Sequence, residues 1–288
     1  MGTQRSSEGP GGGVPLVPSW VQPVSPLPDS APPIEGQPET PPNESQPSEG
    51  ETSVEVPQVA PRLAQRGRFK GARTSLGSFA ATGSRSDLQT GLGHYVRSGY
   101  SGASQLAQRM SRTAKAAGLF YGGLEAFRTG ENKPAEFGLD RDSLRGRPAR
   151  EVGDKIIEAI CPIDGSQDAE ASRDSLTRSI SELLEQNPDL DLTALSPEQI
   201  DFLVEGFVAN DLAHRIELDV GKTIFEKAPD TATAVQRMQD MRDYIREKVS
   251  ASFRARNGQG QKFTRGNAAN LTASVLKDTL AVFEEYLR

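Results

Sequence analysis

Apolar side chains recur every three or four residues through the second half of the chain, which is the period of an amphipathic α-helix. The clearest start is Ser196-Pro197-Glu198-Gln199, where a capping serine, a proline at the first helical position and a glutamine at the third predict a helix. The stripes are Val152, Ile156, Ile157 and Ile160; Leu176, Ile180, Leu183 and Leu184; Ile200, Leu203, Val204, Phe207 and Val208, continuing through Leu212, Ile216 and Ile224 to Lys227; Val235, Met238, Met241, Ile245, Val249 and Phe253; and Leu276, Leu280, Phe283 and Leu287. They predict an all-α bundle of three or four antiparallel helices over residues 149–288.

The pattern is weaker over residues 61–130. Ser86-Asp87 is expected to cap a short helix that carries Leu88, Leu92, Tyr95 and Val96, and a longer helix is expected over residues 104–127. Glycines at 118, 122 and 123 each weaken this longer helix by about 1 kcal/mol relative to alanine, unless a neighbouring helix crosses closely there. The preceding RGRFKGARTSLGSFAATGS, residues 66–84, is rich in glycine and is expected to be a loosely structured arm. Residues 131–148 are polar and are expected to be a linker.

Proline, glycine, serine and glutamate dominate residues 1–60, where one basic residue faces eight acids. Such a segment buries too little apolar area to offset its ordering entropy, so it is predicted to be a disordered tail. Within it, Val14, Pro15, Leu16, Val17, Pro18 and Trp20, the only tryptophan, form an apolar island. Because prolines restrict the backbone in advance, residues 14–20 are a candidate docking motif for a partner's groove.

The charge reverses over residues 62–128, where eleven lysines and arginines face two acids. Arginines interleaved with Phe69, Phe79, Tyr95 and Tyr100 could bind phosphates and stack on bases. Arg66, Arg68, Lys70 and Arg73 are therefore candidate nucleic-acid-binding residues. A basic segment of this kind could equally balance the acidic tail or meet an acidic partner.

Candidate chemistry is sparse. Gly221-Lys222-Thr223 resembles the end of a phosphate-binding loop, but the position five residues earlier is Ile216 and the surrounding pattern is helical, so a lysine on a helix surface is favoured. His214 lies near Asp211, Glu217 and Asp219, for which a solvated helical face is favoured over a metal or acid–base site. Cys161 follows an apolar stripe and is expected to be a small buried thiol. We therefore expect no enzymatic activity, no cofactor and no metal.

The N-terminus offers a different kind of chemistry. Because Gly2 is small, removal of Met1 is expected, which leaves the Gly2 α-amino group as a potential acceptor for a reaction carried out by another enzyme. The start also matches the loose N-myristoylation pattern through Ser6, but the acidic, proline-rich residues that follow would not reinforce membrane binding. The sequence shows no signal peptide and no apolar run long enough to span a bilayer, so a cytoplasmic protein is expected.

Three features together resemble the QatB family, the associated proteins of the bacterial Qat anti-phage defence system. They are the start MGTQRSSEGPGGGVPLVPSW, the later RGRFKGARTSLGSFAATG leading into LGHYVRSGYSGASQLAQRM, and the helical C-terminal half. The resemblance implies a non-enzymatic subunit that works beside an ATPase, a TatD-like nuclease and QatC, a protein similar to 7-cyano-7-deazaguanine synthase. It further implies direct association with the QatC-like member.

Two functions are favoured over a third interpretation, an enzyme whose site the sequence does not reveal. In the first, Gly2 is the acceptor for deazaguanine conjugation, residues 3–13 reach into the partner's active site, and residues 14–20 are the docking anchor. In the second, the chain is a nucleic-acid-binding adaptor that recruits the nuclease and the ATPase through residues 62–128.

Overall fold

The computed structural model describes residues 67–287, which belong to one compact unit, Pro61–Arg288. The prediction of a disordered tail over residues 1–60 lies outside the described residues. Every regular element in the described part is helical, and no strand occurs there. The predicted all-α fold is therefore confirmed.

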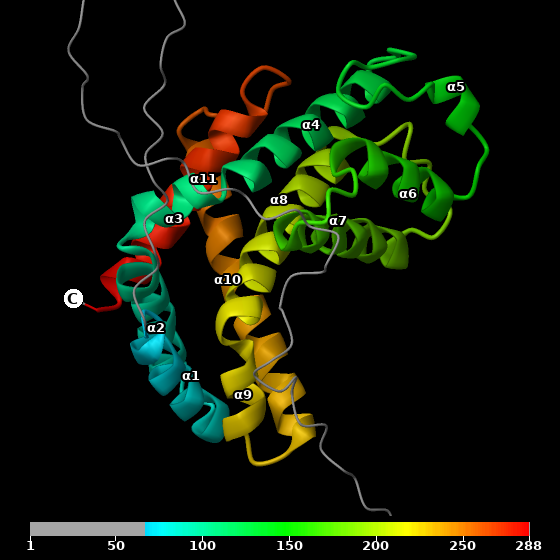
Figure 1. Ribbon diagram of the computed structural model, residues 1–288. Coiled ribbons are helices and arrows are strands. Elements are labelled where there is room, and N and C mark those ends of the chain that lie inside the picture. The colour runs from blue at the N-terminus through cyan, green and yellow to red at the C-terminus, as the bar shows by residue number, and fades with distance from the viewer. Residues whose placement is uncertain (1–66, 288) are drawn as a thin grey trace, which may run out of the picture. The chain divides into compact units, whose positions relative to one another are not determined.

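The helices follow one another directly or through loops, the longest of which, residues 129–140, lies between α4 and α5 (Figure 1). They are α1 (Lys70–Thr82), α2 (Arg85–His94), the π-helical turn η1 (Tyr95–Gly99), α3 (Ala103–Arg109), α4 (Ser111–Arg128), α5 (Arg141–Leu144), α6 (Ala149–Ile160), α7 (Gln167–Gln186), α8 (Pro197–Ile216), the π-helical turn η2 (Glu217–Gly221), α9 (Lys222–Lys227), α10 (Thr231–Gly258) and α11 (Ala268–Glu285).

Helix α8 is the centre of the fold, with α4, α7 and α10 packed around it (Figure 1). Its predicted start is confirmed: the Ser196 hydroxyl accepts from the Gln199 N–H at 3.3 Å, and the Gln199 side chain accepts from the Ser196 N–H at 2.8 Å. The Phe207 ring meets Phe120 of α4 edge-to-face at 6.4 Å. These contacts join the helices before and after residue 149 into one hydrophobic core.

The helix predicted to continue from α8 to Lys227 does so, but through the π-helical turn η2. Asp230 then caps α10, where the sequence predicted a break, by accepting from the Thr233 N–H at 2.8 Å. Val235 departs from its predicted stripe, because its side chain is 57% exposed at the start of α10.

The expectation of a loosely structured arm over residues 66–84 is wrong for residues 70–82, which form α1. Leu76 and Phe79 are buried where α1 packs against α2 and α9. Two of the glycines that suggested flexibility lie at close contacts instead. A Cβ added at Gly71 would lie 2.9 Å from His94, and one at Gly77 would lie 3.2 Å from Lys227.

Two boundaries also differ from the prediction. Helix α2 is capped by Ser84 rather than by Ser86-Asp87, since the Ser84 hydroxyl accepts from the Asp87 N–H at 3.3 Å. The helix expected over residues 104–127 is divided at Met110 into α3 and α4.

Neighbouring residues approach α4 closely at its glycines, as their presence in a helix suggested. A Cβ at Gly118 would lie 2.8 Å from Ala269 of α11, and one at Gly123 would overlap the Phe137 ring. Phe137 and Leu144 are buried, so residues 131–148, expected to be a linker, contribute side chains to the core and include α5.

Candidate functional site: a basic and aromatic cluster at the start of α1

Some of the candidate functional residues precede residue 67, where the described part of the chain begins, and others follow it. Gly2, residues 14–20 and Arg66 lie outside the described residues. Arg68, Lys70 and Arg73 are described, and they lie at the first turn of α1 and just before it. The described candidate site therefore contains Arg68, Lys70 and Arg73 and the residues around them.

Three aromatic rings form the base of the site. Phe69, directly before α1, stacks on Tyr95 of η1 with the ring centroids 5.5 Å apart, and Tyr100 packs against both rings at 5.6 and 5.3 Å. Gly99 allows this packing, because a Cβ there would lie 2.5 Å from the Phe69 ring. The expectation that these aromatic residues stack on bases is wrong for Phe69, Tyr95 and Phe79, whose rings are buried in the core; Tyr100 is half-buried.

Asp219 connects this base to the other π-helical turn. The hydroxyls of Tyr95 and Tyr100 donate to its Oδ2 at 2.9 and 2.7 Å, and Arg73 donates to its backbone carbonyl at 3.1 Å. Burial, with Asp219 nearby, raises the pKa of both tyrosines, so both hydroxyls keep their protons at neutral pH and remain donors. The hydrogen bonds therefore join η1 to η2 at the start of α1.

Guanidinium groups cover the outer side of the cluster. Arg68 lies over Phe69 and Tyr100, 4.5 and 4.9 Å from the ring centroids, and Arg109 lies 5.5 Å from the centroid of Tyr100. Arg109 was not among the sequence candidates. Lys70 and Arg73 are exposed beside them, and neither pairs with a carboxylate in the described part of the chain. Cations held over an aromatic ring provide a site that can bind an anionic group.

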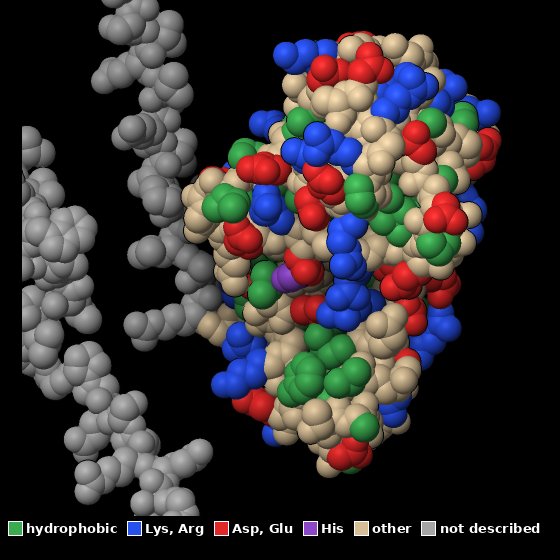
Figure 2. Space-filling model, turned by 90° about the vertical axis from the view of Figure 1, so that its right-hand side faces the viewer, with side chains coloured by type: hydrophobic (Ala, Val, Ile, Leu, Met, Phe, Trp, Pro, Cys, Tyr) green, Lys and Arg blue, Asp and Glu red, His purple; other side chains and the backbone are tan. Residues whose placement is uncertain are grey.

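The acidic residues around His214 do not gather into one site. Asp211 is fully buried, so the favoured solvated face is wrong for this residue. Glu217 pairs with Arg242, His214 contacts Asp174 at 3.1 Å, and Asp219 binds the two tyrosines. Figure 2 shows acidic and basic side chains interspersed over one face of the molecule. Within residues 67–287, no group of three or more His, Cys, Asp or Glu residues is placed to hold a metal ion.

Two further sequence interpretations are confirmed. Lys222 of Gly221-Lys222-Thr223 is exposed on the helix surface, where it pairs with Glu226 at 3.4 Å. Cys161 is buried, and this burial raises the pKa of its thiol to about 11. A thiol with this pKa is almost entirely protonated at neutral pH and is a poor nucleophile.

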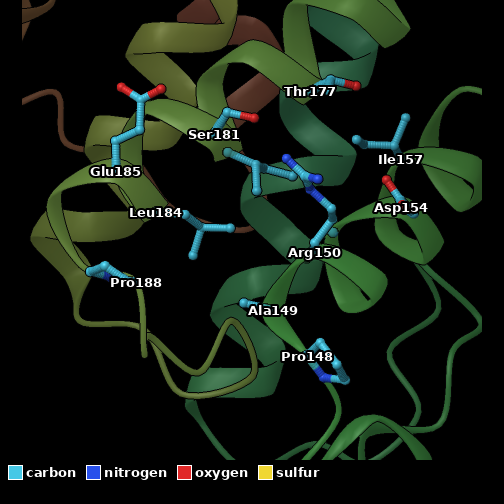
Figure 3. A pocket seen from close by; sticks show the side chains of 12 residues that line it. Pro148, Ala149, Arg150, Asp154, Ile157, Thr177, Ser181, Leu184, Glu185 and Pro188 are labelled. Carbon is cyan, nitrogen blue, oxygen red and sulfur yellow. The ribbon is translucent and has the colours of Figure 1, made fainter.

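A second candidate site, which the sequence did not indicate, is a groove between α6 and α7 with a volume of about 580 Å³ (Figure 3). Ile157 of α6 and Ile180 and Leu184 of α7 supply its apolar surface. Asp154 and Glu185 stand on opposite sides of it, and the Arg150 side chain lies between Leu184 and Ile157 (Figure 3). The apolar stripes predicted both helices, but a stripe does not reveal that part of one face remains uncovered.

The fold and these surfaces define a class: an all-helical protein that carries a basic, aromatic cluster and a partly apolar groove in its described part. A family model described as "Qat anti-phage system associated protein QatB" matches residues 101–283. The chain therefore belongs to the QatB family and has a role in the Qat anti-phage defence system. No curated protein and no solved structure matches the chain. Among the described helices, none combines the length and apolarity that crossing a bilayer requires.

Proposed function

We propose that this chain is a non-catalytic subunit of the Qat system that binds the QatC-like, 7-cyano-7-deazaguanine synthase-like partner and presents its N-terminus to that partner. After removal of Met1, the Gly2 α-amino group is the acceptor. Residues 14–20 dock on the partner, and residues 3–13 reach its catalytic pocket. Ten or so extended residues at about 3.3 Å each span about 30 Å, which is enough to enter a buried site.

The observation that carries this proposal is the N-terminal sequence in a member of the QatB family: an unhindered Gly2, a glycine-rich stretch and then the apolar residues of 14–20. The cluster at α1 adds support, because Arg68 and Phe69 are held on Tyr95 and Tyr100. The first described residues are thereby fixed to the helical body.

The conjugation proceeds in two steps. The partner joins the carboxylate of a deazapurine to the AMP moiety of ATP, with release of pyrophosphate. The Gly2 nitrogen then attacks the activated carbonyl, an amide bond forms, AMP leaves, and the amine loses a proton. Gly2 thus takes the place that ammonia has in the ordinary synthase reaction.

Mass spectrometry of the intact chain and of its N-terminal peptide tests the proposal. The chain is purified from cells that carry the whole operon and from cells that lack the synthase-like gene. We expect a mass increase on Gly2 only in the first. A Trp20→Ala variant, which keeps the acceptor but loses the anchor, should be modified to a lower extent. An unmodified Gly2 in both strains would refute the proposal.

A second candidate function, a nucleic-acid-binding adaptor that recruits the ATPase and the TatD-like nuclease, is favoured by a separate observation. Arg68 and Arg109 flank the half-buried Tyr100, and Lys70 and Arg73 are exposed beside them. Phosphate contacts from such residues would make DNA binding fall steeply with salt.

DNA retention measured at several salt concentrations tests this second candidate. Replacing Arg66, Arg68, Lys70 and Arg73 by glutamine should weaken retention and flatten its salt dependence, whereas Lys133→Gln, at an exposed lysine in the loop between α4 and α5, should not. Equal retention of the wild-type protein and both variants would count against the adaptor function.

A further inference from the structure

The groove between α6 and α7 is open on the outer side of both helices. Its walls come from Ala149, Arg150, Gly153, Asp154 and Ile157 of α6 and from Thr177, Ile180, Ser181, Leu184 and Glu185 of α7, and Pro148 and Pro188 close one end (Figure 3). From Thr177 to Glu185 it follows about 12 Å of helix axis. This length matches two turns of a helix laid against it.

The groove exists because α6 uses one face for the core and leaves part of another uncovered. Val152, Ile156 and Ile160 are buried in the core. Gly153 lets α6 approach α7 closely, since a Cβ there would lie 3.3 Å from Ile180. Ile157 beside it is also buried, and together with Ile180 it forms an apolar floor.

A second hollow of about 410 Å³ extends the groove past its closed end. The two hollows share Pro148, Ala149 and Pro188, and the second is also lined by Asp189 and Asp191. The combined surface thus runs from the middle of α7 to the loop between α7 and α8. An occupant could contact both parts at once.

The charges around this surface are mainly negative. Asp154, Glu185 and Asp189 have neither a hydrogen bond nor an ion pair to any described side chain. On the basic side, Arg147 already pairs with Glu151 at 2.5 Å, which leaves Arg150 as the free cation among the described lining residues. An apolar floor with an acidic rim is complementary to apolar side chains flanked by lysine or arginine.

We propose that the α6–α7 groove binds a basic, amphipathic segment of another protein of the defence system, with its apolar side chains on Ile157, Ile180 and Leu184 and its lysines or arginines at Asp154 and Glu185. This contact is separate from the proposed docking of residues 14–20. It does not require any modification of Gly2.

Site-specific cross-linking identifies the occupant. A photoreactive phenylalanine analogue replaces Thr177, which is exposed on the rim, in the full chain expressed with the whole operon. We expect a cross-link to a partner segment that contains apolar residues next to lysine or arginine. A cross-link to an acidic segment, to another part of this chain or to a second copy would overturn the proposal, as would the absence of any cross-link in a complex that still co-purifies.

The partner identified by cross-linking is then purified, and its binding to variants of this chain is measured by biolayer interferometry. The variants test the apolar space of the groove and its acidic rim separately. Ser181→Trp fills the groove, and Asp154→Lys with Glu185→Lys reverses the charge of its rim. Both should weaken binding at least about tenfold. Glu170→Lys is the matched control, because it reverses an exposed carboxylate of α7 that does not line the groove, and it should leave binding unchanged.

Unchanged binding of the filled and the reversed variants would overturn the proposal. Thermal melting establishes that each variant is folded, and the rim variant changes only exposed residues, so it remains informative if Ser181→Trp is unstable. The mass of Gly2, measured on the same samples, reports the proposed function independently. Loss of groove binding and loss of Gly2 modification can therefore be told apart.

Discussion

Replacing Asp211 by alanine should destabilise the protein strongly, because this carboxylate joins three helices inside the core. It is fully buried on α8 and accepts from the Thr113 hydroxyl of α4 at 2.5 Å, from the Ser172 hydroxyl of α7 at 2.9 Å and from Arg215 Nε at 3.3 Å. Removing one partner of a buried charged pair costs about 3–5 kcal/mol. For a domain of this size, that corresponds to a decrease in the melting temperature of about 6–20 °C.

A second carboxylate on the same arginine provides the control. Asp168 pairs with Arg215 Nη1 at 2.9 Å, but its side chain is 60% exposed. Asp168→Ala should therefore cost less than about 1 kcal/mol. The free energy of unfolding is measured by urea denaturation of both variants. If Asp211→Ala loses no more stability than Asp168→Ala, then burial is not what makes this carboxylate important, and the reasoning is refuted.

Three further predictions concern other buried groups. Burial, with Asp201 nearby, raises the pKa of Glu205 to about 7, so ionisation of this carboxyl disfavours the folded state as pH rises from about 4.5 to 7. Glu205→Gln should therefore stabilise the protein by about 2–3 kcal/mol at pH 8 and hardly at all at pH 4, as measured by urea denaturation. Equal gains in stability at the two pH values would contradict this prediction. Gly99→Ala should displace the Phe69 ring and cost about 1–3 kcal/mol in thermal melts, whereas Gly258→Ala, which meets no neighbouring atom, should not destabilise the protein. Cys161 should react with a maleimide far more slowly in the native protein than in urea, and equal rates would show that the thiol is accessible.

The parts of the fold that could be predicted are those with local signals. The start of α8 at Ser196 and the breaks at Pro188 and Pro229 depend on residues within one turn of the boundary, and all three are found. The stripes after residue 149 predicted their helices for the same reason. Helix α1 was missed because its apolar side chains are buried against α2 and against α9, the latter about 150 positions later, and the glycine-rich composition does not reveal these contacts.

The candidate site shows the same limit. Arg68, Lys70 and Arg73 could be selected as basic residues near aromatic ones. Spacing in the sequence could not predict that most of these rings are buried. Nor could it predict that Tyr95 and Tyr100 bind Asp219, more than one hundred positions away. Asp211 was assigned to a solvated face because it lies near other charged residues, whereas the helices that bury it, α4 and α7, precede it by 98 and 39 positions at the contacts.

The two surfaces proposed as binding sites lie on different parts of the helical body. The cluster at α1 involves η1, α3 and η2, whereas the groove is formed by α6 and α7 at the other end of the body (Figure 1). An occupant of one surface would not obstruct the other. The same molecule could therefore bind nucleic acid at one surface and a protein of the defence system at the other.

The π-helical turn η2 also fixes the rotational phase of the helix that contains it. A π turn accommodates one residue more than the corresponding α-helical turn, and each residue of an α-helix accounts for about 100° of rotation. Deleting Leu218, directly before Asp219, would let α8 and α9 run on as one regular helix, and Asp219, rotated by about 100°, would then point away from Tyr95 and Tyr100. The length of the chain at this turn, as much as the identity of its residues, determines whether Asp219 reaches the two tyrosines.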